Sequence, residues 1–302
     1  MSTDELIKNA LNAGMFESAC VLVGNSEKVL YHKAFGGAGE DSIFNIGTLT
    51  QSICTSLILM QLVAEKHLNL NSSVAKYLPE FGEEGKNKVT LKQLLKHTSG
   101  LPKSGKYLNE DLSVLEITER ICYEELEFPP AFEKMKSDLG YIILGAVIEK
   151  ISGMKFQDFF ESKIATPLGL SKTSFPIAGS RAVLGHTGLS STASDCWKIS
   201  TAILQSYSDE REFIPKPVID EFIGPKARYK LGWEKDQLIS TGIMMISDTG
   251  CFLWMDLEKK LIIEIFTSGK NTEAAIKWIP GALNALLSDI LPQPSNVPKE
   301  SL

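Results

Sequence analysis

The feature that most limits the fold is an apolar run between Thr48 and about Leu68. Its large apolar residues fall on every side of a helix with 3.6 residues per turn: Leu49, Ile53, Leu57, Ile58, Leu59, Met60, Leu62 and Val63. A helix that is apolar nearly all round must be surrounded by protein. We therefore expect a buried central helix. The chain's 302 residues, 43% of them hydrophobic, suffice for one large domain or two closely packed ones.

The character of the sequence changes twice along the chain. An amphipathic helix is expected at residues 4–13, followed by a hairpin whose strands are Ala19–Val23 and Val29–Phe35. A helix is expected at Asp138–Ser152, with Gly153 placed to end it. Beyond residue 180 the pattern predicts β-rich runs and a closing helix, at Tyr229–Trp233, Gly242–Ser247, Cys251–Met255, Leu261–Phe266 and Glu273–Leu287.

This order favours an α/β (α+β) architecture in which an antiparallel sheet is flanked by terminal helices and an all-α region is inserted between its early and late strands. We expect residues 1–45 and 180–290 to form the sheet domain and residues 46–179 to form the mainly helical region. The polar, proline-rich residues 291–302 are expected to be a loosely held tail.

Composition and charge narrow the classes of partner. The formal net charge is −6 and no Lys/Arg cluster stands out along the sequence, so we expect a small-molecule ligand or a protein partner, with no nucleic acid and no membrane. The acidic amino terminus does not resemble a secretory signal, which predicts a cytoplasmic protein. The five cysteines lack the paired spacing of a zinc site, and we expect reduced thiols, no metal and no cofactor.

Five segments then resemble one family in its own order. Residues 44–51 (FNIGTLTQ) resemble the segment of serine β-lactamases and penicillin-binding-type hydrolases that carries Ser-x-x-Lys at the start of a buried helix. Residues 91–102 (LKQLLKHTSGLP), 137–145 (SDLGYIILG), 188–195 (GLSSTASD) and 253–256 (LWMD) are similar to later segments of the class C β-lactamase, DD-peptidase and esterase branch. The resemblance implies a β-lactamase/transpeptidase-like fold.

The same resemblance assigns Thr48 to the position of the family's serine nucleophile and Gln51 to that of its lysine. Thr48 keeps a hydroxyl but adds a methyl group that crowds the approach. A neutral amide has no basic site near neutral pH, so Gln51 cannot act as a general base.

The other two motifs are changed as well. In the Tyr-x-Asn motif the tyrosine position is Lys136 and the asparagine position is Asp138. The Lys/His-x-Gly motif falls on Met245-Ile246-Ser247, so the family's cationic or histidine group is missing. We expect Met245 and Ser247 to line the ligand cleft, with His186 at its rim.

Several reactive side chains also have plain structural explanations. His97 and Ser99 lie in a segment that matches a structural turn of the family, and Cys54 lies on the buried helix, where packing is the expected role. Lys136 is expected to pair with Asp138 or Glu133 and to stay charged; if it instead lies beside Thr48, it could serve as a base.

Three functions are compatible with these residues. The first is a non-hydrolytic pseudoenzyme, or a repurposed relative, that binds a small molecule or partner in the old cleft. The second is a rewired hydrolase or acyltransferase that uses Thr48 with Lys136 or Asp138 and backbone N–H groups, including that of Thr48, as an oxyanion hole. The third is a biosynthetic enzyme that uses the cleft without covalent chemistry.

Overall fold

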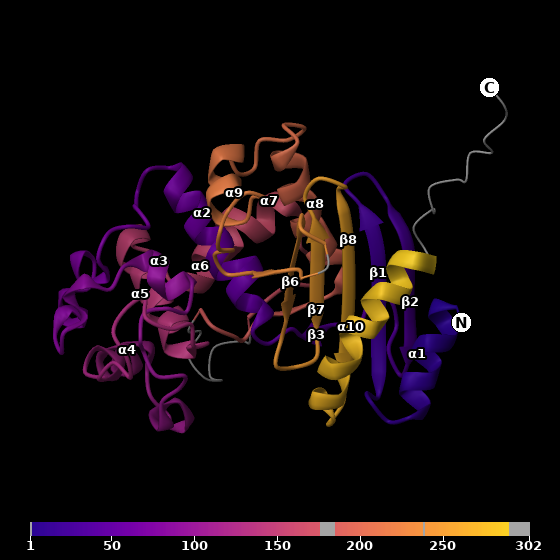
Figure 1. Ribbon diagram of the computed structural model, residues 1–302, viewed down its shortest axis with the longest axis horizontal. Helices are drawn as coiled ribbons and strands as arrows, with labels where there is room; N and C mark the ends of the chain where they lie inside the picture. The colour runs from indigo at the N-terminus through magenta and orange to yellow at the C-terminus, as the bar shows by residue number, and fades with distance from the viewer. Residues whose placement is uncertain (1, 176–184, 238, 290–302) are drawn as a thin grey trace.

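The computed structural model describes residues 2–175, 185–237 and 239–289. The predicted tail, 291–302, and the predicted boundary at residues 179 and 180 lie outside them. Figure 1 shows a sheet with two helices along one face and a group of helices at the opposite end of the molecule.

The main sheet has six strands in the order β2-β1-β8-β7-β6-β5, and every neighbouring pair is antiparallel. Its strands are β1 Ser18–Asn25, β2 Val29–Gly36, β5 Glu234–Lys235, β6 Gly242–Ile246, β7 Phe252–Asp256 and β8 Leu261–Ser268. Two short strands, β3 Phe44–Asn45 and β4 Ser190–Ser191, pair separately. The fold is therefore the predicted mixture of an antiparallel sheet and helices.

The first and last helices cover one face of the sheet. Helix α1 (Thr3–Asn12) starts at a capping box in which Ser2 and Glu5 bond reciprocally, and it packs beside α10 (Thr272–Asp289). Side chains alternate across β8: Ile263 and Ile265 join the core under these two helices, whereas Ile262 and Phe266 join the larger core on the other face.

Helix α8 (Ala193–Tyr207) packs on that other face, against β1 and β8. The remaining helices are α2 Leu57–Ala64, α3 Leu91–Leu95, α4 Val114–Cys122, α5 Asp138–Ser152, α6 Phe156–Phe160, α7 Thr166–Leu168 and α9 Lys216–Phe222. The bounds of α5 agree with the prediction, and Gly153 ends it in a left-handed conformation (φ 67°).

Two predicted elements differ from the structure. The segment Tyr229–Trp233 is not a strand; it consists of bends and turns, and the strand β5 begins only at Glu234. Gly232 in this segment has φ 79°, and its amide donates to Leu95 O. A left-handed residue whose amide bonds outside the sheet breaks the extended ladder that the aromatic residues favoured.

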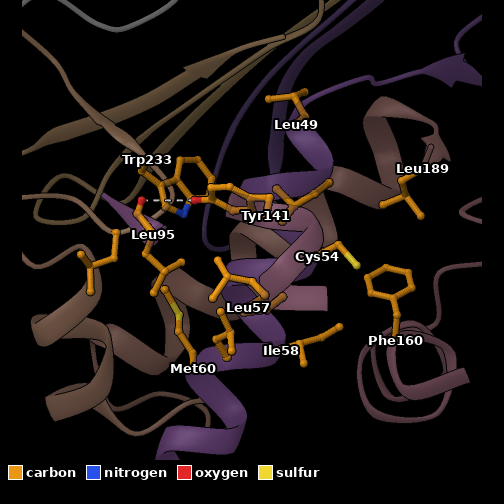
Figure 2. Packing of buried hydrophobic residues seen from close by; sticks show 14 of the residues in the cluster. Leu49, Cys54, Leu57, Ile58, Met60, Leu95, Tyr141, Phe160, Leu189 and Trp233 are labelled. Carbon is orange, nitrogen blue, oxygen red and sulfur yellow. Dashed lines mark hydrogen bonds between the residues drawn. The ribbon is translucent and has the colours of Figure 1, made fainter. Parts of the chain in front are cut away.

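The central apolar helix is buried as expected but is not uniform. A π-helical stretch, Gln51–Ser56, precedes α2, and the helix ends at Ala64 rather than near Leu68. Figure 2 shows Leu49, Cys54, Leu57 and Ile58 packed among Tyr141, Phe160 and Leu189 from other segments. π-helical turns often mark functional sites, and this one directly follows the turn that carries Thr48.

Candidate functional site

Thr48 lies in a turn immediately before the central helix and is half-buried. The turn is fixed by Asn45 Oδ1, which accepts from Gly47 N at 3.0 Å. Gly47 has φ 50°, and a Cβ added there would lie 2.3 Å from Asp248 Oδ1. Only glycine therefore lets the segment around Asp248 come this close to the turn.

Thr48 and Asp248 are joined by two reciprocal hydrogen bonds. The backbone N–H of Thr48 donates to Asp248 Oδ1 at 2.9 Å. The backbone N–H of Asp248 donates to Thr48 Oγ1 at 3.3 Å. The turn after β6 thus contacts the first motif directly. The Asp248 carboxylate accepts a hydrogen bond from the Thr48 amide, which would have to stabilise an oxyanion in an acyl transfer.

Gln51, at the family's lysine position, is buried with 3% of its surface exposed. The π-helical stretch that carries it is tied down by Ser52 Oγ, which donates to Gly232 O at 2.5 Å, and by Thr55 Oγ1, which donates to Gly185 O. Burial raises the pKa of the Cys54 thiol, so this residue is a packing group as expected. This helix turn carries no basic side chain beside Thr48.

His97 positions the segment that leads into α5. It lies in the left-handed region (φ 56°), its carbonyl accepts from Met135 N at 2.9 Å, and its Nδ1 accepts from Ser137 N at 3.2 Å. Burial, followed by the charges of Lys134 and Lys136, lowers the pKa of His97 to about 4. A neutral, inward-facing imidazole that accepts a backbone hydrogen bond is a structural group, consistent with the expectation for this turn.

Lys136 is exposed and does not pair as expected. Its Nζ lies 3.9 Å from Glu234 Oε1, and the same carboxylate bonds Lys134 Nζ at 2.7 Å. The expected pairing with Asp138 or Glu133 is therefore wrong. Asp138 is the first residue of α5, whereas Lys136 lies before the N-cap Ser137, outside the helix.

Asp138 is half-buried and lies within electrostatic range of Asp248. Desolvation by burial raises its pKa, the charge of Asp248 raises it further, and His186 and Lys103 oppose the shift. Its backbone N–H donates to Lys103 O at 2.9 Å. Asp138 thus lies within electrostatic range of His186 and of Asp248, and Asp248 is the residue that bonds Thr48.

Met245 and Ser247, predicted to line the ligand cleft, are both largely buried. Met245 lies on β6 opposite Leu253 and borders a small pocket with Trp233 and Glu234. Ser247 is 1% exposed, and its Oγ accepts from Cys251 N at 3.0 Å, which closes the turn between β6 and β7. The hydroxyl of Ser247 therefore holds the turn that presents Asp248.

Sequence reasoning missed Asp248 and Glu234. Asp248 directly follows the three residues aligned with the third motif, so the sequence alone could have placed it near the site. Nothing in the sequence indicated its contact with Thr48. Glu234 is almost 100 residues from Lys136. Only the folded chain brings these two residues together.

Two features are absent from residues 2–175, 185–237 and 239–289. Within these ranges, none of the helices has the length and apolar character needed to cross a bilayer. Over the same ranges, no group of three or more His, Cys, Asp or Glu side chains is arranged to hold a metal ion.

Comparisons with known proteins agree on one fold and one family. The family model described as Beta-lactamase matches residues 3–286. A Salmonella typhimurium protein named D-alanyl-D-alanine carboxypeptidase is 29% identical over 200 residues, which are 57% of this chain and 46% of that protein. The matched region thus spans about half the length of the curated relatives.

Solved structures resemble nearly the whole chain at low sequence identity. A β-lactamase-like protein from Bacteroides dorei has a TM-score of 0.79 at 19% identity, covering 93% of this chain and 98% of that one. EstCE1, titled a hydrolase with promiscuous acyltransferase activity, has a TM-score of 0.80 at 16% identity, covering 94% and 97%. A class C β-lactamase from Rhodobacter sphaeroides has 0.77 at 14% identity, covering 94% and 99%. At these identities the likeness shows the fold alone.

Proposed function

Because this chain belongs to the β-lactamase family, we propose that it is a non-hydrolytic member that binds a small molecule in the former active-site cleft without forming an acyl intermediate. The observation that carries the proposal is the pair of hydrogen bonds between Thr48 and Asp248. An acyl transfer needs free N–H donors where the oxyanion develops. Here the backbone N–H of Thr48 already donates to the Asp248 carboxylate, and the backbone N–H of Asp248 already donates to the hydroxyl of Thr48.

The groups around Thr48 support the same proposal. Gln51 supplies no base, and the ammonium of Lys136 lies beside the half-buried Glu234 carboxylate. A negative charge on Asp248 also repels the developing oxyanion, so the carboxylate opposes the reaction electrostatically as well as sterically. Loss of a nucleophile's base alone costs several orders of magnitude in rate.

The first test is acylation. After prolonged incubation with benzylpenicillin, the intact mass should show no adduct, and chromogenic β-lactams should remain uncleaved. A stoichiometric penicilloyl group on Thr48 would overturn the proposal.

A second test separates the two obstacles. The double variant Thr48→Ser/Gln51→Lys restores the first motif but keeps Asp248, and we expect it to remain unacylated. A triple variant that also carries Asp248→Ser frees the backbone amide of residue 48 from the carboxylate and should form a measurable acyl adduct. If the double variant is acylated as fast as the triple variant, Asp248 does not obstruct the oxyanion site.

A rewired hydrolase or acyltransferase is the second candidate, and Asp138 is the observation that favours it. A half-buried carboxylate with a raised pKa, within electrostatic range of the Asp248 that bonds Thr48, is suited to general-base chemistry. In that case the protein cleaves activated esters, and both Thr48→Val and Asp138→Asn abolish cleavage without unfolding it. We expect the wild-type protein not to cleave activated esters. If it does cleave them, we expect Lys136→Met to leave the rate of cleavage unchanged.

A further inference from the structure

Three cationic side chains, Lys96, Arg228 and Lys230, lie at the end of α3 and in the turns before β5. The ammonium of Lys96, at the end of α3, lies 3.7 Å from the ring centroid of Tyr229. The guanidinium carbon of Arg228 lies 5.3 Å from the same centroid. Tyr229 is 47% exposed, so one accessible aromatic ring holds two cations close together.

In the part of the chain that the structure describes, these three cations form no ion pair, although Glu234, which binds Lys134, lines the same pocket as Lys96 and Lys230. Within the described residues, no carboxylate oxygen lies within 4.0 Å of the charged nitrogens of Lys96, Arg228 or Lys230, whereas Lys92 pairs with Glu221. Lys230 is largely buried, and its Nζ donates to the carbonyl of Gly224.

The pKa of Lys96 is lowered by its surroundings. Burial lowers it first, and the charges of Lys92 and Arg228 lower it further. Like charges held together without a counter-ion raise the free energy of the empty site, and an anion relieves that cost. The arrangement therefore favours a negatively charged ligand group.

The position of these cations connects them with the cleft. Lys96 and Lys230 line one pocket with Trp233, Glu234 and Met245. Met245 stands where the third motif of the family has its cationic or histidine side chain. The pocket that contains Met245 is thus lined by the positive charges of Lys96 and Lys230, neither of which stands at a position of the three catalytic motifs.

We propose that Lys96 and Arg228, with Lys230 behind them, bind an anionic group, a carboxylate or a phosphate, of the ligand in the former active-site cleft. This inference rests on the proposed function, because it names the chemical class of the ligand that the cleft takes. Lys96 supplies an ammonium held over Tyr229, and Arg228 supplies a planar fork that can donate two hydrogen bonds to one anion.

The test is an NMR titration of the full chain with three probes: inorganic phosphate, N-acetylglycine and the neutral N-acetylglycinamide. We expect at least one anion to bind at low salt, to weaken as NaCl is added, and to bind more tightly than the neutral amide. Preference for phosphate or for N-acetylglycine identifies which anion the site takes. Failure of both anions to bind overturns the inference.

Variants assign the binding to these residues. Lys96→Met and Arg228→Gln should each weaken the bound anion about tenfold, as expected for one charge-assisted hydrogen bond. Lys277→Met removes the same charge from an exposed position on α10, at the other end of the molecule from α3 in Figure 1, and should leave the affinity unchanged. Equal affinity in wild type, Lys96→Met and Arg228→Gln contradicts the inference.

The result can be read independently of the proposed function. A penicilloyl adduct on Thr48 would overturn the non-hydrolytic proposal and leave the titration result standing. A chain that is neither acylated nor binds the anions keeps the proposed function and loses only the anionic class of ligand.

Discussion

Two segments meet at the former active site, and they are held in different ways. The segment that enters α5 is fixed by hydrogen bonds to the buried turn around His97. Ser137 N donates to the His97 imidazole, and Ser137 Oγ donates to Pro102 O at 2.6 Å. The Thr48 turn is held from across the site by the exposed Asp248. The frame of the site is thus built from buried contacts, while the amide and hydroxyl of Thr48 are bonded by one exposed residue, Asp248, through its carboxylate and its backbone N–H. Changes to the frame should alter stability, and changes to the reactive side should alter chemistry.

The largest effect should follow from truncating the frame at Tyr141. Its ring is fully buried and tilted against His97 at 5.1 Å, and its hydroxyl donates to Leu95 O at 3.3 Å, as Figure 2 shows. Tyr141→Ala should lower the free energy of unfolding by about 3–5 kcal/mol in a denaturant titration. Tyr141→Phe, the matched control, should cost about 1 kcal/mol, since it removes only the hydrogen bond. Equal losses for the two variants would mean that the ring does not support the frame.

The second effect is a pH dependence from His97. Its folded pKa of about 4 lies below the ordinary histidine pKa of 6.5, so the unfolded chain binds the proton more readily between these two pH values. His97 therefore contributes stability above pH ~6.5 that is lost as the pH falls toward 4. His97→Asn, which tolerates the left-handed backbone, should flatten the slope of unfolding free energy against pH in that window. An unchanged slope would show that His97 is not held neutral.

On the reactive side, Asp248→Ala should have a smaller effect on stability. The variant removes the acceptor of the Thr48 amide at a partly exposed position, so we expect a loss of about 1 kcal/mol in the same denaturant titration. Asp248→Asn, which keeps an acceptor oxygen, should lose less. A loss as large as that of Tyr141→Ala would contradict the distinction between frame and reactive side.

The smallest effect is expected at Lys136. Its ammonium is exposed and lies 3.9 Å from Glu234, which Lys134 already binds more closely. Lys136→Met should change the free energy of unfolding by less than about 0.5 kcal/mol. Lys134→Met serves as the comparison, because it removes the shorter contact and should have the larger effect of the two. The reverse order would show that Lys136 is the residue that holds Glu234.

Most of the fold could be predicted from local patterns. The bounds of α5 follow from its apolar face and from Gly153, and the hairpin and late strands follow from short apolar runs between turns. The segment Tyr229–Trp233 was the exception, because its aromatic residues favour a strand while Gly232 turns the backbone to bond Leu95. That bond joins residues far apart in the chain, and no local pattern contains it.

For the site, the residue types alone establish which reactive groups are absent: the amide of Gln51 has no basic nitrogen, and Met245 has no charge, wherever the chain places them. Only the tertiary structure decided what replaced them. Asp248 came onto the Thr48 amide, Lys136 came to Glu234 instead of its near neighbours, and Lys96 and Arg228 met over Tyr229. The reason is physical: the chemistry of a side chain is fixed by its atoms, whereas its partner is fixed by distances that arise only when distant segments pack together.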